Sequence, residues 1–254
     1  MSVLAVIPAR YASSRFPGKP LVRLAEKPMI QHVWERVRRA KDVSGVLVAT
    51  DDERILRAVK EFDGHAVMTR SDHRSGTERV AEVAASSAGR DAEIIVNVQG
   101  DEPLIDPAAV DAAVEVLLND ATVEVATLAV PIAVAADVMD PNVVKVVLDF
   151  QGNALYFSRA PIPWVRGGGA GQQAFPHLKH IGLYVFRRSA LLEFPTFPQG
   201  QLEKLEQLEQ LRWLENGFTI RVAETTYDSV SIDVVEDVPR VEKLLREVAA
   251  GQAG

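Results

Sequence analysis

The chain has 254 residues and contains no cysteine. This absence excludes disulfide bonds, metal sites built on thiolates and cysteine nucleophiles, and it fits a reducing compartment. Histidine is scarce as well, with five residues, and these form no cluster with the spacing of zinc ligands. A zinc centre is therefore not expected.

Two further absences limit the partners and the location. The chain has no excess of positive charge: its formal net charge is −7, so no global basic field attracts nucleic acid or an anionic membrane. No apolar run approaches the ~20 residues that cross a bilayer, and the N-terminus lacks the pattern of a signal peptide. We predict a soluble, cytoplasmic protein in which a local cluster of cations holds any anionic ligand.

Hydrophobic residues make up 47% of the chain, enough for one large α/β core or a core with a subdomain. The first half alternates apolar runs typical of buried strands with helical patterns. Strands are predicted over residues 3–7, 46–49, 66–68 and 93–98, and helices over residues 28–40, 52–62, 76–86 and from Pro107, with Asp106 as N-cap. This alternation predicts a mostly parallel sheet with helices on both faces, and such sheets bind ligands at the carboxyl ends of their strands.

The second half has a different pattern. Strands with hairpin-like connections are predicted over residues 124–130, 143–148, 154–157 and 179–187. Residues 166–171 are rich in glycine, which indicates a mobile loop or a lid. Leucine occurs at every third position over residues 202–214, a spacing that winds around a helix. We predict a single helix there, packed over a broad face and partly against another subunit.

Residues 7–21, IPARYASSRFPGKPL, follow the first predicted strand and contain Arg10, Arg15 and Lys19. Three cations that converge at the end of a strand suit a polyphosphate, because each phosphate oxygen accepts charge-assisted hydrogen bonds. The alternative is a solvated basic loop with surface ion pairs. Composition alone does not separate the two interpretations.

Two aspartates are candidates for a metal site. Asp101 comes directly after the apolar strand predicted at residues 93–98, and Asp233 follows the apolar alternation at residues 230–232, interpreted as the final strand. Mg²⁺ takes one or two protein carboxylates together with substrate phosphates, so this pair would suffice. A role in shaping the turn before the next helix is the alternative for Asp101.

The segment DHRSGTER at residues 72–79 has two interpretations. Ser75 and Glu78 fit a capping box, which makes the segment a well-formed helix start. A helix N-terminus also recognises an anion or a base edge, and Gly76 would allow a ligand to approach closely. We expect the capping role under either interpretation.

Several basic side chains of the second half have open roles. Arg159 suits a substrate carboxylate in bidentate geometry, or a structural salt bridge. His177 and His180 suit either sugar hydroxyls or structural hydrogen bonds. Lys145 interrupts an apolar run, so it either marks an edge strand or is buried with a partner.

Together these segments resemble the family of 3-deoxy-manno-octulosonate cytidylyltransferases, also called CMP-KDO synthetases. The resemblance covers nearly the whole chain in order, through IPARYASSRFPGKPL, MTRSDHRSGTERVAEV, NVQGDEPLI, PNVVKVVLD, ALYFSRAPIPW, KHIGLYVF and LEQLEQLR. It implies a Rossmann-like nucleotidyltransferase fold, with one domain over residues 1–254 and a smaller α+β subdomain for sugar binding and dimerisation over about residues 130–215. It also implies a homodimer with Mg²⁺ as cofactor, which converts CTP and 3-deoxy-D-manno-octulosonate (KDO) to CMP-KDO and pyrophosphate for lipopolysaccharide biosynthesis.

The resemblance further implies roles for individual residues. The triphosphate of CTP would be held by Arg10, Arg15 and Lys19, the last two also stabilising the departing pyrophosphate. The cytosine and ribose pocket would be formed with Arg70, Asp72, Ser75 and Gln99. Mg²⁺ would be carried by Asp101 and Asp233. The acid sugar would be contacted by Arg159, His180, Tyr184, Glu209 and Gln210.

One segment departs from the family pattern. The family reads Asp-Thr-Pro-Glu-Asp where residues 233–237 of this chain read Asp-Val-Val-Glu-Asp, so the aspartate is kept and the Thr-Pro helix start is lost. Rival functions are a cytidylyltransferase for 8-amino-KDO or a sialic acid, a metal-dependent glycosyltransferase, and a non-catalytic nucleotide-binding protein. The three cations of residues 7–21 disfavour a glycosyltransferase, because a sugar nucleotide has no free triphosphate.

Overall fold

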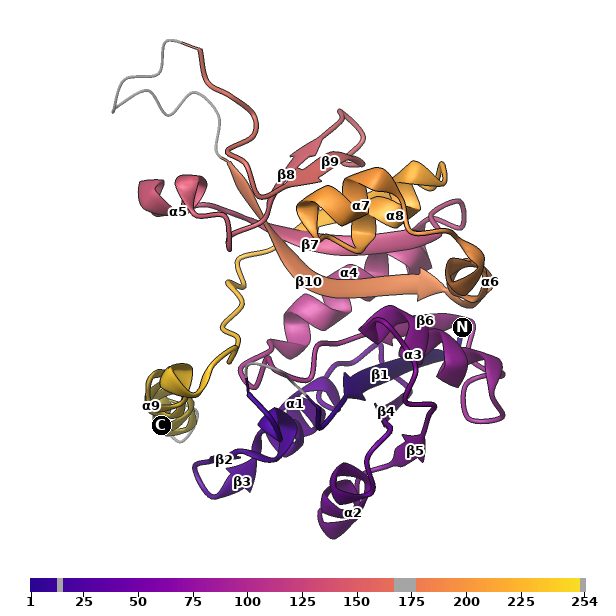
Figure 1. Ribbon diagram of the computed structural model, residues 1–254, viewed down its shortest axis with the longest axis vertical. Helices are drawn as coiled ribbons and strands as arrows, with labels where there is room; N and C mark the ends of the chain where they lie inside the picture. Colours follow the sequence, from indigo (N-terminus) through magenta and orange to yellow (C-terminus); the bar gives the residue numbers. More distant parts are fainter. Residues whose placement is uncertain (13–15, 167–176, 252–254) are drawn as a thin grey trace. The chain divides into compact units, whose positions relative to one another are not determined.

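The structure, a computed structural model, describes residues 1–12, 16–166 and 177–251 (Figure 1). The chain divides into two compact units, one of Met1–Asp111 with Ser229–Gly254 and the other of Ala112–Asp228. Arg15 and residues 167–171 of the glycine-rich segment lie outside the described residues. The expected single domain with a subdomain over residues 130–215 stays a prediction.

The first unit is built on a parallel sheet with the strand order β6-β1-β4-β5. Its strands are β1 (Val3–Ala9), β4 (Gly45–Thr50), β5 (Ala66–Met68) and β6 (Ile94–Asn97), and its sheet-packed helices are α1 (Met29–Val37), α2 (Glu53–Glu61) and α3 (Gly76–Ala85). All four residues of β6 and five of the seven in β1 are buried, as expected for parallel strands covered by helices. The predicted α/β fold with a mostly parallel sheet is confirmed.

The C-terminal segment returns to this first unit. It consists of the short 3-10 helix η3 (Val235–Asp237) and α9 (Val238–Gly251). Ile232 and Val241 are fully buried in one hydrophobic cluster with Leu24 and Met29. Leu24 belongs to the small hairpin of β2 (Arg23–Leu24) and β3 (Lys27–Pro28). This packing holds the residues just before η3 against the part of the chain that follows β1.

Two helix starts agree with the capping predicted from the sequence. The Ser75 hydroxyl accepts the N–H of Glu78 at 3.2 Å at the start of α3. The Asp106 carboxylate accepts the N–H of Ala108 at 3.0 Å at the start of α4 (Pro107–Asn119). Each bond satisfies a backbone donor that the first turn of a helix leaves without an internal partner.

The second unit combines antiparallel and parallel pairing. Strand β10 (Leu178–Arg187) is antiparallel to β7 (Val125–Pro131) and β8 (Lys145–Leu148), β8 is antiparallel to β9 (Ala154–Ser158), and β11 (Ile220–Glu224) is parallel to β7. The helices are α5 (Ala135–Met139), α6 (Arg188–Glu193), α7 (Gln201–Glu206) and α8 (Gln210–Glu215). The ring of Trp213 stacks on Phe186 at 5.3 Å and on Phe194 at 4.9 Å between centroids, so α8 and β10 share an aromatic core.

The prediction of one helix over residues 202–214 is wrong. The segment forms α7 and α8, separated by Gln207 in the left-handed region with φ 54°. Leu208 and Leu211 are buried whereas Leu205 is 81% exposed. Leucines at every third position cannot all face one side of a straight helix, and the break lets the later ones reach the core. Packing of this segment against another subunit stays a prediction.

The expected final strand at residues 230–232 is also absent from the described part of the chain, where β11 is the last strand. The segment is instead tied down by one backbone bond, from the N–H of Ile232 to the carbonyl of Asp101 at 3.0 Å. An apolar alternation therefore marked a buried connection rather than a strand.

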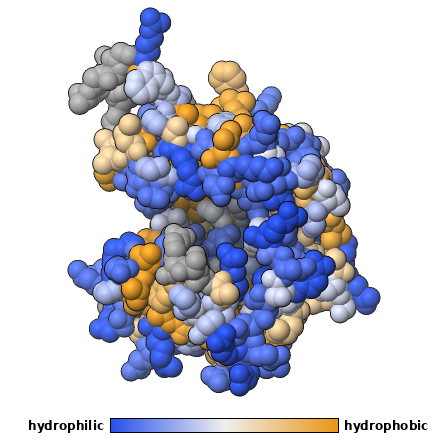
Figure 2. Space-filling model, viewed as in Figure 1, coloured by the Kyte–Doolittle hydropathy of each residue, from blue (hydrophilic) through white to orange (hydrophobic). Residues whose placement is uncertain are grey.

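The face seen in Figure 2 is mostly hydrophilic, with hydrophobic residues in small groups. Among the described residues, no helix is both long and apolar enough to span a bilayer.

Candidate active site

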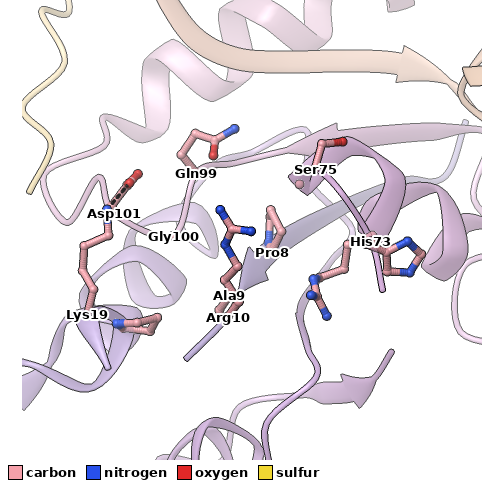
Figure 3. A pocket seen from close by; sticks show the side chains of 12 residues that line it. Pro8, Ala9, Arg10, Lys19, His73, Ser75, Gln99, Gly100 and Asp101 are labelled. Carbon is pink, nitrogen blue, oxygen red and sulfur yellow. Dashed lines mark hydrogen bonds and ion pairs between the residues drawn. The ribbon is translucent and has the colours of Figure 1, made fainter. Parts of the chain in front are cut away.

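A cavity of about 220 Å³ lies in the first unit at the carboxyl ends of β1 and β6 (Figure 3). Its lining residues are Pro8, Ala9, Arg10, Lys19, Pro20, His73, Ser75, Gly76, Arg79, Gln99, Gly100 and Asp101. Figure 3 shows Lys19 and Asp101 meeting on one side and His73 with Ser75 on the other, with Arg10 and Gln99 between them. The position agrees with the site that a parallel sheet predicts.

After β1, one backbone hydrogen bond joins Gly18 to Tyr11. Gly18 adopts the left-handed conformation with φ 73°, and its N–H donates to the Tyr11 carbonyl at 2.9 Å. A side chain at this glycine would meet the Tyr11 ring at 3.1 Å, so glycine is required both for the backbone angle and for the close approach. The Arg54 guanidinium lies 3.3 Å from the centroid of the same ring. The contacts of Tyr11 with Gly18 and Arg54 fix the backbone next to Lys19, which lines the cavity.

Lys19 links the two candidate metal ligands. Its ammonium lies 2.6 Å from Asp101 Oδ2 and 3.8 Å from Asp233 Oδ1. The Lys19 side chain is 15% exposed, so this cation sits largely shielded from water at the edge of the cavity. The structure therefore brings together the cation and both aspartates that the sequence singled out.

Asp237, which matches the last aspartate of the family pattern, holds the start of η3 in this chain without the Thr-Pro pair. Its carboxylate accepts the N–H of Asp233 at 2.9 Å and of Val234 at 3.1 Å. Burial opposes ionisation of Asp237, but these two donors outweigh it, and the pKa of this carboxyl is lowered. A carboxylate inside η3 thus caps the segment and fixes the backbone of Asp233.

The donor set fits Mg²⁺ in a limited sense. Among the described residues there is no group of three or more histidine or carboxylate side chains suited to a metal. Asp101 and Asp233 do converge on one cation, and Mg²⁺ typically needs one or two carboxylates because water and substrate phosphates complete its shell. The residues present therefore suit a Mg²⁺ that arrives with a nucleotide.

The residues expected around the base divide into two groups. Ser75 and Gln99 line the cavity. Arg70 and Asp72 do not; Arg70 Nε pairs with Asp72 Oδ1 at 2.9 Å, and both side chains are about two-thirds exposed, at 68% and 70%. Arg10 lines the cavity as expected, and Arg15 lies outside the described residues.

Two lining residues were missed at the level of sequence. The His73 side chain is 6% exposed and contacts the Glu82 carboxylate. Arg79, buried on α3, pairs with Asp51 at 3.2 Å and donates to the Arg70 carbonyl at 3.3 Å. Both lie in the DHRSGTER segment, but nothing in its spacing shows which of its five charged or titratable side chains turn inward.

In the second unit, two of the five residues expected around the sugar, His180 and Tyr184, lie in one aromatic cluster. His180 Nε2 is 3.0 Å from Thr127 Oγ1, and its ring lies 5.4 Å from that of Tyr184. Burial lowers the pKa of His180 to about 3, so the imidazole is neutral at physiological pH. Burial, and after it the charge of Glu209, raises the pKa of the Tyr184 hydroxyl well above its usual value. Gln210 is buried at the start of α8, one residue after Glu209.

Arg159 is held by the backbone. Its guanidinium donates to the carbonyls of Glu206 at 2.7 Å, Pro141 at 2.9 Å and Gln207 at 3.4 Å. These bonds use three of the five N–H groups of an arginine, which leaves two for a ligand. His177 has a structural contact, 3.0 Å from Nε2 to the Pro163 carbonyl.

The sequence left two interpretations of Lys145 open, an edge strand or a buried lysine with a partner, and the structure confirms the second. Lys145 is 0% exposed, and β8 pairs with strands on both sides, so it is not on an edge. Its ammonium donates to the carbonyls of Asp140, Val143 and Arg159 at 2.9, 2.6 and 2.7 Å. Desolvation lowers the pKa of this lysine.

Comparison with known proteins gives consistent matches. A family model described as cytidylyltransferase matches residues 4–224. The 3-deoxy-manno-octulosonate cytidylyltransferase of Solibacter usitatus is 53% identical over 244 residues, which cover 96% of this chain and 94% of that protein. The enzyme of the same name from Syntrophotalea carbinolica is 53% identical over 251 residues, covering 97% and 99% of the two chains.

Solved structures agree in fold. A CMP:2-keto-3-deoxy-manno-octonic acid synthetase complexed with CTP superposes with a TM-score of 0.91 at 42% identity, covering 97% of this chain and 99% of that one. The 4-diphosphocytidyl-2C-methyl-D-erythritol synthase of Anaerococcus prevotii reaches a TM-score of 0.64 at 13% identity, covering 96% of each chain, and shares the fold alone.

Proposed function

Because the chain belongs to the cytidylyltransferase family, among the 3-deoxy-manno-octulosonate cytidylyltransferases, we propose that it transfers the cytidylyl group of CTP to KDO. The products are CMP-KDO and pyrophosphate. The observation that carries the proposal is the convergence of Asp101 and Asp233 on Lys19. Lys19 and Asp101 line a cavity at the carboxyl ends of parallel strands. The match to a synthetase complexed with CTP supports the choice of nucleotide.

In this reaction the protein positions the two substrates and neutralises negative charge on the phosphates. The anomeric hydroxyl of KDO attacks the α-phosphorus of CTP in line, the new P–O bond forms, the bond to pyrophosphate breaks, and the hydroxyl loses its proton. Phosphoryl transfer of this kind needs no covalent protein intermediate. In this proposal Arg10, Arg15 and Lys19 hold the triphosphate. Arg15 and Lys19 also lower the energy of the charge that develops on the leaving pyrophosphate.

Asp101 and Asp233 would hold Mg²⁺, which when bound neutralises phosphate charge and lowers the pKa of the attacking hydroxyl. In the absence of the nucleotide, the Lys19 ammonium partly neutralises both carboxylates. The Lys19 ammonium offsets part of the repulsion between the Asp101 and Asp233 carboxylates. Both carboxylates therefore stay ionised and can bind a Mg²⁺ that enters with the nucleotide phosphates.

Recognition of the two substrates uses different kinds of side chain. Ser75 and Gln99 offer a hydroxyl and an amide to the nucleoside, and we include Arg70 and Asp72 in that set on the resemblance alone. For the sugar, His180 and Tyr184 are uncharged hydrogen-bonding groups, because burial disfavours the charged form of each. The carboxylate of KDO therefore needs Arg159, whose two remaining N–H groups suit it. Glu209 and Gln210 complete the proposed contacts with the sugar.

We test the function by pyrophosphate release with Mg²⁺ over a matrix of CTP, UTP, ATP and GTP against KDO, 8-amino-KDO and sialic acid. The expected result is release with CTP and KDO and little with any other pair. Release with 8-amino-KDO or sialic acid in preference to KDO reassigns the sugar. Absence of release with every pair removes cytidylyltransferase activity and leaves nucleotide binding or a glycosyltransferase.

The finer expectations are that the protein is a cytoplasmic homodimer and that Mg²⁺ is its cofactor. The homodimer is proposed on the resemblance alone. Sedimentation equilibrium measures the mass of the assembly. Removal of Mg²⁺ with a chelator, followed by titration with the metal, measures the cofactor requirement.

A further inference from the structure

The second unit contains a buried cation that the proposed mechanism does not use. Lys145 is fully buried on β8, and all three of its N–H groups donate to backbone carbonyls. Its hydrogen-bond acceptors are neutral. The charges of Asp140 and Glu206 favour the ammonium, but desolvation outweighs them and lowers the pKa of Lys145, so burying this cation is costly. An apolar side chain of similar length would avoid that cost, so the lysine needs a reason other than filling space.

The three acceptors show what Lys145 connects. Two of them, the carbonyls of Asp140 and Val143, belong to the turn that precedes β8. The third is the carbonyl of Arg159, next to Ser158, which pairs with Lys145 across β8 and β9. One ammonium thus ties the turn at residues 140–143 to the end of β9.

The same turn holds the Arg159 side chain. Arg159 Nη1 donates to the carbonyl of Pro141 at 2.9 Å, between the two turn carbonyls that Lys145 binds. The Arg159 N–H donates to the Glu206 carboxylate at 2.9 Å, and its guanidinium reaches the carbonyls of Glu206 and Gln207. The main chain of Arg159 is therefore fixed from both sides, by Glu206 at the nitrogen and by Lys145 at the oxygen.

We propose that Lys145 is a positioning residue for the acid-sugar substrate: it orients Arg159 by holding both the Arg159 carbonyl and the turn that carries the Pro141 acceptor. The inference rests on the proposed function, in which Arg159 binds the sugar carboxylate. Lys145 touches no substrate itself. Without it, the guanidinium keeps its charge and loses the fixed direction of its two remaining N–H groups.

Lys145→Met tests the inference in steady-state kinetics with CTP and KDO on the full chain. A displaced carboxylate anchor is expected to raise the KM for KDO roughly 10- to 100-fold while the KM for CTP changes less than about twofold. Lys204→Met, which makes the same change at an exposed position of α7, is the matched control and should keep both KM values. Thermal melting reports whether each variant is folded.

Asp140→Ala gives a second test that leaves the buried lysine in place. The Asp140 carboxylate accepts the N–H of Asn142 at 2.8 Å and its side-chain amide at 3.0 Å, so its loss loosens the turn from the solvent side. The KM for KDO should rise less than in Lys145→Met, and the KM for CTP should again change little. If Lys145→Met does not fold, this variant alone tests whether the turn positions Arg159.

The outcomes are distinguishable. A wild-type protein that releases no pyrophosphate from CTP and KDO overturns the proposed function, and this inference with it. An active wild type with unchanged KDO kinetics in Lys145→Met, or with KM values for CTP and KDO that rise together, overturns the inference alone. If Lys145→Met does not fold, unchanged KDO kinetics in Asp140→Ala overturns it.

Discussion

At the scale of single residues, Lys19 shows how one side chain serves a site with both signs of charge. Its ammonium lies 2.6 Å from Asp101 and 3.8 Å from Asp233. Two carboxylates this near to each other repel, and a shared cation offsets that repulsion. A triphosphate brings further negative charge, which attracts the same cation, so the balance of the site changes when the nucleotide binds.

Asp101→Asn should lower kcat at least about 100-fold, because the substitution keeps the size of the side chain and removes the charge that a metal and Lys19 need. CTP binding should largely remain, because Arg10 and Lys19 are unchanged. Pyrophosphate release measures the first and equilibrium titration with CTP the second. Asp91→Asn is the matched control, since the Asp91 side chain is 91% exposed. Normal turnover in Asp101→Asn would remove this residue from the proposed metal site.

The sequence predicts a residue of the candidate site when its place next to the end of a strand is enough to bring it to the cavity. Asp101 follows a buried strand, and parallel strands deliver such residues to one edge, so its place at the cavity followed from the pattern. Asp233 was also predictable as a candidate ligand. The hydrogen bond that fixes its backbone was not, because its acceptor, the Asp237 carboxylate, lies within a 3-10 helix that the sequence pattern did not indicate. The inward turns of His73 and Arg79 depend on Glu82 and Asp51, partners that sequence spacing does not reveal.

At the scale of elements, the break between α7 and α8 is stabilised by contacts that cross it. The Glu215 carboxylate accepts the N–H of Leu202 at 3.0 Å and of Glu203 at 3.2 Å, so the end of α8 caps the start of α7. Glu203 in turn forms a two-point ion pair with Arg212, at 2.8 and 2.6 Å. The bonded residues lie 9 to 13 positions apart in the sequence. The spacing of the leucines does not reveal such contacts, and it therefore indicated one helix. The regular strands and helices of the first half were predictable because burial alone sets their pattern.

Glu203→Gln should destabilise the protein by about 3–5 kcal/mol, because it leaves the Arg212 charge buried without its counter-charge. Both side chains are nearly buried, at 6% and 5% exposure, and the Arg212 guanidinium lies 4.4 Å from the Phe194 ring. Urea unfolding measures the change.

The matched control for this pair is Glu35→Gln. It breaks the pair with Lys27, where the two side chains are 29% and 46% exposed. An exposed pair of this kind is worth about 0–1 kcal/mol. Equal losses in the two variants would contradict a special role for the buried pair.

At the scale of the whole molecule, both units contain a histidine that folding keeps neutral. His32 lies in the first unit, 2.8 Å from the Leu24 carbonyl, and burial lowers its pKa. His180 lies in the second, where burial lowers the pKa from 6.5 to about 3. The unfolded chain binds a proton at each position below about pH 6.5, whereas the folded chain resists protonation. Stability therefore falls as the pH falls below about 6.5, and for His180 this continues until about pH 3.

Carboxylates contribute at lower pH. The pKa of Asp52 is lowered by its hydrogen bond with Arg54, and that of Asp120 by its hydrogen bonds with Thr122. Groups whose pKa is depressed on folding contribute stability that is lost only as the pH falls through the folded pKa, below their usual value of 3.8. Between pH 5 and 6.5 the histidines therefore determine the slope.

His180→Gln should flatten that slope. At pH 5 a histidine that is neutral when folded and has a pKa of 6.5 when unfolded costs about 2 kcal/mol relative to neutral pH, and the variant loses this cost. Urea unfolding of both proteins at pH 7.5, 6 and 5 gives the free energy of unfolding at each pH. His65→Gln is the matched control, because His65 is exposed and the slope should match that of the wild type. A wild-type slope in His180→Gln would show that folding does not lower the pKa of this imidazole, and burial would then not be what keeps it neutral.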